Sequence, residues 1–309
     1  MSASAGLNPN VVKTALDKVF KQGFAISQHP GYADATSPNV FKQDTIDRAA
    51  VITEIFKGTG LWGLKIEEGD VPEASPKVGN QQTFSVTEFA QSVDITKNFF
   101  DDEQHGVYEK LVADMADTGR ITRDRNAFAV YRNSRSTALT NDGLSILNDA
   151  HVTLAGGTVD NLLAASALSE TVLNNLIVNL IEQKAQDGTV RGNMPKVLLV
   201  PPALFKIASE ITESELRSNT PDNDMNVYSA KYGIAVATSP HLGAASGGSD
   251  TAYWLLANNH SVTRWVRQGV ETALIDWKFQ RNNNYVYKGS FREVVGCLDY
   301  VGICGSAGA

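Results

Sequence analysis

The chain has 309 residues, of which 42% are hydrophobic and 20% charged, and this is an ordinary globular composition. Its net charge of -7 and isoelectric point of about 5.3 argue against sequence-specific nucleic-acid binding, because such binders are usually basic. The two cysteines, Cys297 and Cys304, form no CxxC pair and no disulfide framework, so a reducing cytoplasm is the expected folding compartment. We expect no signal peptide, and polar residues interrupt the most apolar segment, 162–181, so we expect no membrane span.

The first 60 residues predict a short helix followed by an extended segment. Apolar side chains recur on one face over residues 9–28, and Pro9 is suited to a helix start. Residues 29–45 are rich in Pro, Gly, Ser, Asp and Asn and indicate an extended arm. The next stretch, residues 45–56, is compatible with either a short helix or a strand.

Residues 61–97 predict a long hairpin. The stretch "LWGLKIE" (61–67) is a candidate strand, residues 68–82 carry two Gly and two Pro and indicate an open loop, and residues 83–97 read as one strand of about 15 residues. The alternation of apolar residues changes phase after Val86, which predicts a bulge or bend. A long, half-polar, bent hairpin is poorly suited to a core, so we expect it to reach out of its domain.

The remaining chain predicts one long helix, a mixed domain and a set of long strands. Residues 101–135 indicate a helix roughly 50 Å long, with a possible kink at Gly119. Residues 150–260 alternate between helices and buried strands, as in a small sheet flanked by helices. There, Ser169 is the expected cap and Gly188 the expected stop of a helix. After residue 260, four apolar runs separated by turn signals predict long antiparallel strands.

The motifs that would carry chemistry are absent or incomplete. Residues 58–63 match GxGxxG, but the stretch that follows cannot form the helix that a pyrophosphate site requires. The five histidines show no metal-ligand spacing, and Asp222, Asp224 and Asn226 begin a calcium-loop pattern that lacks its glycine and its closing glutamate. The strand "KVLLV" (196–200) runs into Pro201 and Pro202 with no reactive residue at the junction. We therefore expect no catalytic residue, no cofactor and no metal site.

Residues 148–256 carry a resemblance to a known family. Six motifs follow one another here: a His-containing loop, a Leu-Ser helix start, a Gln-Lys…Asp-Gly turn, "LLVPPAL", "IAVATSPHLG" and "YWLLAN". This order resembles that of the major capsid proteins of tailed bacteriophages, and within them the Mu-like head subunits. The resemblance implies an α+β fold of the Hong Kong 97 type. Its implied parts are an N-terminal arm (1–60), an extended β-hairpin loop (61–97), a peripheral domain with a long spine helix (98–149), a mixed α/β axial domain (150–258) and the peripheral β-sheet with the C-terminus (259–309).

The resemblance also implies a function and partners. The subunits would form hexamers and pentamers of an icosahedral head, assembled in the cytoplasm of an infected bacterium, that encloses double-stranded DNA without reading its sequence. Scaffolding, portal and possibly decoration proteins would be partners, and no membrane would be involved. The residues that we expect at contacts between subunits are Lys65, Glu67, Glu68 and Lys77 on the hairpin, and Asp222 and Asp224 on a loop near the symmetry axis, where repeated aspartates could attract cations.

Two alternatives remain open at this point. An encapsulin-type compartment shares the fold but encloses cargo in place of DNA. An α/β enzyme would need a cleft with perturbed titratable groups, and the sequence nominates none.

Overall fold

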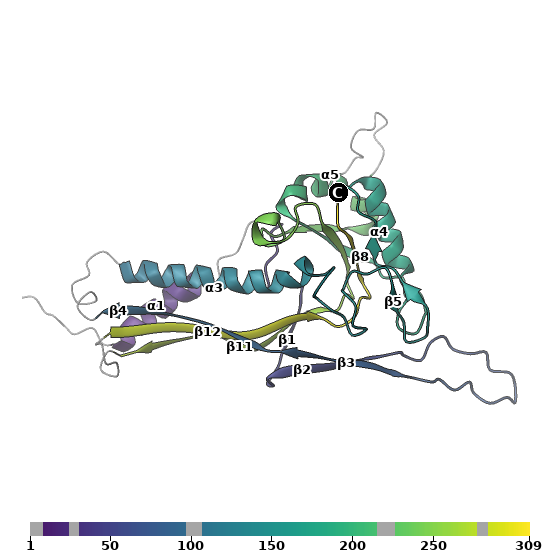
Figure 1. Ribbon diagram of the computed structural model, residues 1–309, viewed down its shortest axis with the longest axis horizontal. Coiled ribbons are helices and arrows are strands. Elements are labelled where there is room, and N and C mark those ends of the chain that lie inside the picture. Colours follow the sequence, from purple (N-terminus) through teal and green to yellow (C-terminus); the bar gives the residue numbers. More distant parts are fainter. Residues whose placement is uncertain (1–8, 25–30, 97–106, 215–225, 277–283) are drawn as a thin grey trace, which may run out of the picture.

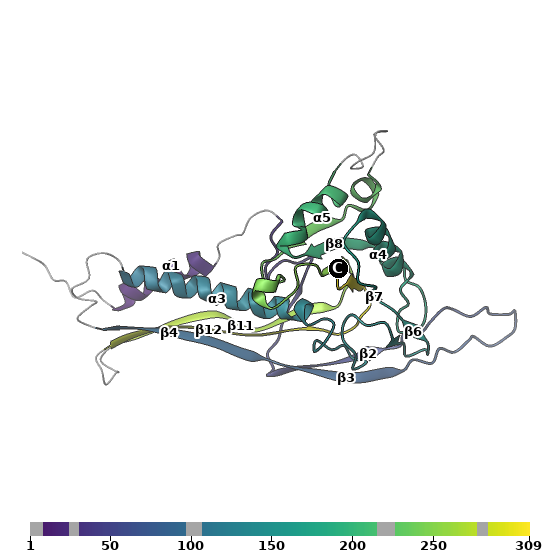
Figure 2. The same cartoon turned by 45° about the horizontal axis from the view of Figure 1, so that its top comes forward.

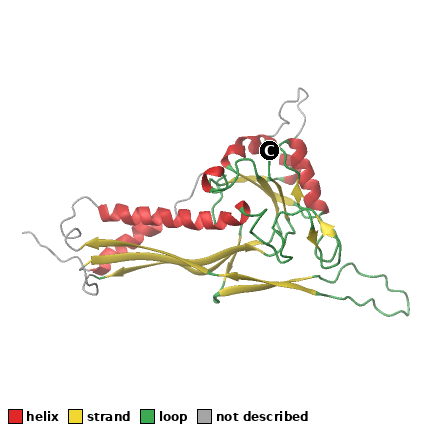
Figure 3. Ribbon diagram, viewed as in Figure 1, coloured by secondary structure: helices red, strands yellow, loops and turns green. Residues whose placement is uncertain are grey.

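The computed structural model describes residues 9–24, 31–96, 107–214, 226–276 and 284–309. These residues form a long flat part joined to a compact part, with a thin hairpin that runs out beneath the compact part (Figure 1). Helices and strands are mixed throughout (Figure 3), as the α+β expectation requires. None of the helices in the described ranges is long and apolar enough to span a membrane.

The flat part is a four-stranded sheet with two helices on one face. Its strand order is β1-β11-β12-β4, with β1 parallel to β11 and the other pairs antiparallel. The strands are β1 (Lys42–Thr45), β4 (Thr87–Thr96), β11 (Val262–Ile275) and β12 (Asn284–Cys297). Figure 2 shows the helices over this sheet, α1 (Pro9–Phe24) and α3 (Val107–Arg132).

The predicted helix of residues 101–135 is α3, which runs without a break through Gly119. A Cβ at Gly119 would lie 3.3 Å from the ring of Phe24, so the glycine lets α1 pack closely against α3. The predictions for residues 97–106 fall outside the described residues, as do residues 25–28 of the first predicted helix.

The compact part is a five-stranded sheet covered by helices. The strand order is β7-β13-β10-β8-β9. The strands are β7 (Leu162–Leu163), β8 (Pro195–Val200), β9 (Ala235–Thr238), β10 (Tyr253–Ala257) and β13 (Ile303–Ser306). Helices α4 (Glu170–Glu182) and α5 (Phe205–Thr212) pack on it, and a two-stranded ribbon of β5 (His151–Val152) and β6 (Thr158–Val159) lies beside them.

Local signals explain much of this part, with two corrections. Ser169 caps α4 as predicted, its side chain accepting a hydrogen bond from the Val172 N–H, but the helix ends at Glu182 and Gly188 instead turns the following loop at φ 79°. Pro201 and Pro202 lead from β8 through a single 3-10 turn into α5. We expected residues 262–304 to lie largely in the long sheet, but β13 pairs with β10 and β7 in the other sheet.

The segment expected to be an extended arm is partly core. Ala33, Ala35, Val40 and Phe41 are all at most 2% exposed, and residues 42–45 form β1. The phenol of Tyr131 on α3 donates a hydrogen bond of 2.6 Å to the carbonyl of Val40. Residues 33–45 therefore connect the two parts of the molecule and cannot swing free as an arm.

The hairpin also differs from its prediction. Its strands are β2 (Ala50–Phe56) and β3 (Val78–Ser85), which pair with each other, while residues 61–67 form no strand. The predicted single strand of residues 83–97 is two strands. β3 pairs with β2 as far as Ser85, and β4, which follows it, pairs with β12 in the long sheet. The change of phase at Val86 marks this change of partner. The ambiguous residues 45–56 contain a strand.

A buried carboxylate fixes the connecting segment to α3. The side chain of Asp124 is fully buried and accepts a hydrogen bond of 3.1 Å from the Ala35 N–H. The Arg123 Nε lies 3.3 Å from one carboxylate oxygen and the Arg120 Nη1 lies 3.6 Å from the other. Removing one partner of such a group leaves buried charges without compensation.

We expect Asp124→Ala to lower the free energy of unfolding of the unassembled subunit by about 3–5 kcal/mol. Asp114→Ala, on the exposed side of the same helix, should change it by less than about 0.5 kcal/mol. Urea denaturation followed by circular dichroism measures both. Equal stability of the two variants would show that the carboxylate does not hold the segment.

His260, in the turn between β10 and β11, gives a pH-dependent contribution to stability. Burial, with Lys42 nearby, lowers its pKa from 6.5 to about 4. Between pH 6.5 and about 4, His260 is protonated in the unfolded state and neutral in the folded state. The free energy of unfolding is therefore highest above pH 6.5 and decreases as the pH falls towards 4. We expect His260→Gln to remove up to about 3 kcal/mol of pH dependence from this window. Unfolding titrations at several pH values test this, and parallel curves for parent and variant would contradict it.

Candidate intersubunit contact surface

The end of the hairpin carries large apolar side chains that the described part of the chain leaves exposed. Residues 57–77 contain no helix or strand and run out past the compact part (Figure 1). The exposed fractions of the large apolar side chains there are 84% for Leu61, 96% for Trp62, 90% for Leu64, 72% for Ile66 and 73% for Val71. We call these five residues the apolar tip. Clustered exposed apolar side chains of this kind mark a binding surface.

Four charged residues predicted at intersubunit contacts lie on the same exposed segment as the apolar tip. All four are exposed; Lys65, Glu67 and Glu68 alternate with residues of the apolar tip, and Lys77 follows it along the chain. None of the four forms an ion pair within the described part of the chain. Glu68 has a φ of 63°, and it lies in a turn that is closed by a hydrogen bond from the Gly69 N–H to the Ile66 carbonyl. The contact role of these four residues stays a prediction, and Asp222 and Asp224, with their predicted cation site, lie outside the described residues.

His151, Cys297 and Cys304, three buried groups that could carry chemistry, are enclosed by the body itself. His151 places Nδ1 2.6 Å from Asp142 Oδ2 and Nε2 3.2 Å from the Ile146 carbonyl, and its ring stacks on Tyr300. Both ring nitrogens therefore have partners in the chain. Burial raises the pKa of the Cys297 thiol to about 12, and it also raises the pKa of Cys304, so neither thiol is a ready nucleophile.

Metal-ligating residues are likewise dispersed. Within the described ranges, no three residues of the His, Cys, Asp and Glu types are grouped closely enough to hold a metal ion. Three of the five histidines, His151, His241 and His260, are buried in separate places, and His29 and His105 lie outside the described residues.

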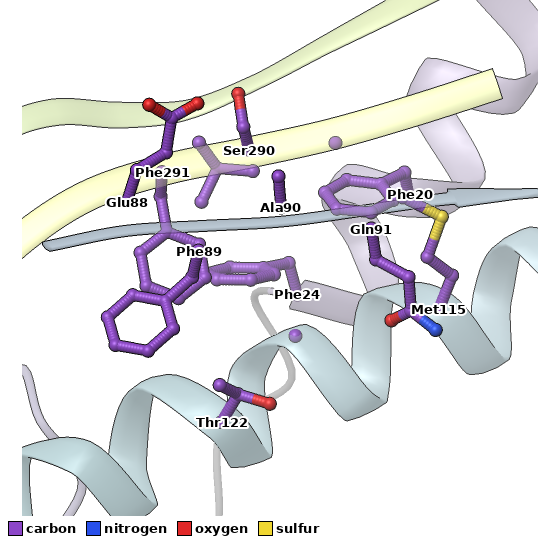
Figure 4. Close-up of a pocket in the computed structure, with 13 residues that line it drawn as sticks. Phe20, Phe24, Glu88, Phe89, Ala90, Gln91, Met115, Thr122, Ser290 and Phe291 are labelled. Atoms are coloured by element: carbon purple, nitrogen blue, oxygen red, sulfur yellow. The ribbon is translucent and has the colours of Figure 1, made fainter.

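A cavity of about 250 Å³ lies between α1, α3 and the long sheet. Figure 4 shows four phenylalanine rings and Met115 in its lining, together with polar side chains such as Gln91, Thr122 and Ser290. Phe24 packs against Phe20 and Phe291, and Phe291 stacks on Phe89. The one carboxylate at its edge, Glu88, lies 3.7 Å from Arg292. The cavity reflects the packing of α1 on the body and holds no group arranged for acid-base chemistry.

The apolar tip was missed as such by the sequence interpretation. The alternation in residues 61–67 predicts a strand, whose apolar face would be covered. In the structure β3 pairs with residues 50–56, which lie in the ambiguous stretch 45–56. The available signal was the set of three glycines, Gly58, Gly60 and Gly63, which interrupts a strand pattern around Leu61 and Trp62.

Comparisons with known proteins identify the class to which this fold belongs. The capsid of a native GTA particle matches with a TM-score of 0.58 and 12% identity over 91% of this chain and 92% of that one. The capsid of cyanophage P-SCSP1u matches with a TM-score of 0.58 and 13% identity over 92% of this chain and 91% of that one. A virus-like particle from Pyrococcus furiosus matches with a TM-score of 0.53 and 11% identity over 95% of this chain and 96% of that one. The chain therefore has the fold of subunits that build closed shells, which confirms the Hong Kong 97-type expectation. A comparison with curated protein sequences found no match.

The family follows from a second comparison. A family model described as phage capsid protein matches residues 80–305, about three quarters of the sequence, and the chain belongs to this family. It is a structural protein of the phage head shell, as its resemblance to tailed-phage major capsid proteins implied.

The exposure of the apolar tip predicts that it contributes little to the stability of the isolated subunit. We expect the double variant Trp62→Ser/Leu64→Ser to unfold within about 0.5 kcal/mol of the parent, because both side chains are already in water. Trp254→Ser is the control, since Trp254 is 2% exposed and should cost about 3–5 kcal/mol. Denaturant titration of the unassembled proteins measures both. A large loss in the tip variant would place the tip in the core of its own subunit.

Proposed function

We propose that the chain is the major subunit of its shell and that the apolar tip is buried against a neighbouring copy when the shell forms. The observation that carries this proposal is the position of five large apolar side chains at the end of a hairpin that extends beyond its own subunit. The two sheets correspond to the peripheral and axial domains implied by the resemblance. The axial part then meets its copies around the fivefold and sixfold axes.

The tip combines apolar and acidic groups, and this mixture suits a contact that forms only on assembly. Glu67, Glu68, Asp70 and Glu73 outnumber Lys65 within residues 65–73. Acidic side chains keep an unassembled tip in solution and discourage two tips from meeting. The receiving surface on the neighbour is accordingly apolar with basic groups near it.

The finer parts of the function follow from the resemblance. The subunit assembles in the cytoplasm of the infected bacterium, with a scaffolding and a portal protein as partners, and it encloses double-stranded DNA without catalysing a reaction. The acidic net charge supports enclosure without tight binding of DNA. The Mu-like branch is proposed on the motifs of residues 148–256.

The experiment is assembly in the presence of the cognate scaffold or at high protein concentration, observed by negative-stain microscopy. The parent should form closed shells or rings of five and six subunits. Trp62→Ser/Leu64→Ser should remain folded and fail to form closed shells, because the contact loses about 1.5–3 kcal/mol for each apolar side chain. A matched control is Val152→Ser, an exposed apolar residue of the body, which should assemble normally. Normal shells from the tip variant would overturn the proposal.

A further inference from the structure

The hairpin packs on its own body through an aromatic contact near the base of β3. The ring of Phe84 stacks on Trp265 of β11, with centroids 5.1 Å apart and an interplanar angle of 28°. Next to it, Gly296 of β12 has no side chain, and a Cβ built there would lie 2.2 Å from Cε1 of Phe84. The ring thus occupies the space that any other residue at position 296 would need. We call Gly296 and Trp265 the Phe84 seat.

The seat lies on the face of the long sheet opposite the helices. Gly296 pairs with Thr263 and Trp265 with Val294, whereas Glu293 and Arg264, whose side chains form a buried ion pair, belong to the alternate positions that face the other way. β3 therefore crosses the outer face of the sheet, and the ring of Phe84 is the contact that joins the two sheets there. No comparable aromatic contact is made by β2 in the described structure.

Further along β3, polar contacts hold the strand in line. The Gln82 side-chain amide donates to the Leu139 carbonyl at 2.9 Å. The Asn80 and Asn141 side-chain amides each donate to the backbone carbonyl of the other residue. These contacts are exposed or partly exposed, so each adds little rigidity by itself.

Between these polar contacts and the body, the packing is open. A cavity of about 170 Å³ has Ile55 and Asn80 of the hairpin on one side and residues 140–142 and 152–154 on the other. Leu154, at the edge of this space, packs against Gly79 of β3, and the rest of the cavity is unfilled, so apolar packing there offers little resistance to a tilt of the hairpin. The seat then supplies the aromatic contact at the base of β3 that sets the direction of the strand relative to the long sheet.

The length of the hairpin amplifies any change at the seat. An extended chain from Phe84 to Glu73 spans up to about 35 Å at ~3.3 Å per residue, so a tilt of about 10° would displace the tip by roughly 6 Å. A contact between apolar side chains is lost over such a distance.

We propose that Gly296 is a positioning residue for assembly: the absence of a side chain there seats Phe84 and thereby aims the apolar tip at the neighbouring subunit. This inference rests on the proposed function of the tip. The long sheet of one subunit would then determine where the hairpin of that subunit contacts the neighbouring subunit.

The first test uses unassembled subunits and does not depend on shell formation. Spin labels on Ser75→Cys, at the hairpin end, and Thr137→Cys, on the body, report the distance between them, because the native Cys297 and Cys304 are buried. We expect Gly296→Ala to shift or broaden this distance distribution by several Å, as the ~6 Å lever estimate implies. The matched control is Gly269→Ala in β11 of the same sheet, where an added Cβ meets no atom within 4 Å.

The second test is assembly of the same variants. Gly296→Ala should lose closed shells, Gly269→Ala should keep them, and Phe84→Leu in the Gly296→Ala background should restore them in part by making room for the added methyl. If Gly296→Ala does not fold, Phe84→Ala tests the seat in its place, because it removes the ring without adding an atom. In a folded body this variant should broaden the distance distribution.

The outcomes separate the two proposals. An unchanged distance distribution in folded Gly296→Ala, or in Phe84→Ala where the former does not fold, overturns the seat. A displaced hairpin that still gives normal shells overturns its role in assembly. If the parent itself forms no shells, the proposed function fails while the distance measurement still decides whether the seat aims the hairpin.

Discussion

The arrangement of this subunit depends on one constraint, which is that the described part of the chain leaves the apolar side chains of the hairpin end exposed. Burying a large apolar side chain contributes about 1.5–3 kcal/mol, so five of them together approach the net stability of a whole domain. Trp62, at 96% exposure, forgoes this stabilisation in the isolated subunit. A second copy can supply it, and the family to which the chain belongs builds shells from many copies.

A hairpin that binds elsewhere needs a rigid base, and the rest of the fold supplies one. The long pair β11–β12 belongs to the flat part, and the strand after β12 returns to the compact sheet as β13. Residues 33–45 connect the same two parts from the other direction, held by Asp124 and Tyr131 of α3. The Phe84 seat lies on the long sheet of this doubly connected body, so a rigid sheet sets the direction of the hairpin.

Local patterns predicted the elements whose shape is decided by neighbouring residues. The periodicity of α3, the Ser169 cap of α4 and the prolines between β8 and α5 were all readable, and the phase change at Val86 correctly indicated a break. The errors concern choices made at a distance. The partner of β3, the sheet that receives β13 and the burial of Phe41 depend on chain segments far away in sequence, which periodicity does not report. The four charged hairpin residues lie on an exposed segment, and their role at a contact stays a prediction. The apolar tip was hidden because the same alternation also fits a covered strand.

The central claim is that assembly buries the apolar tip, and the solvent exposure of Trp62 measures it most directly. Hydroxyl-radical footprinting with mass spectrometry compares the oxidation rate of Trp62 in unassembled subunits and in purified shells, with the buried Trp254 as an internal reference. We expect rapid oxidation of Trp62 in the subunit and strong protection in the shell, while Trp254 is slow in both. Equal, rapid oxidation of Trp62 in both states would contradict the account, because the tip would then remain in water after the shell has closed.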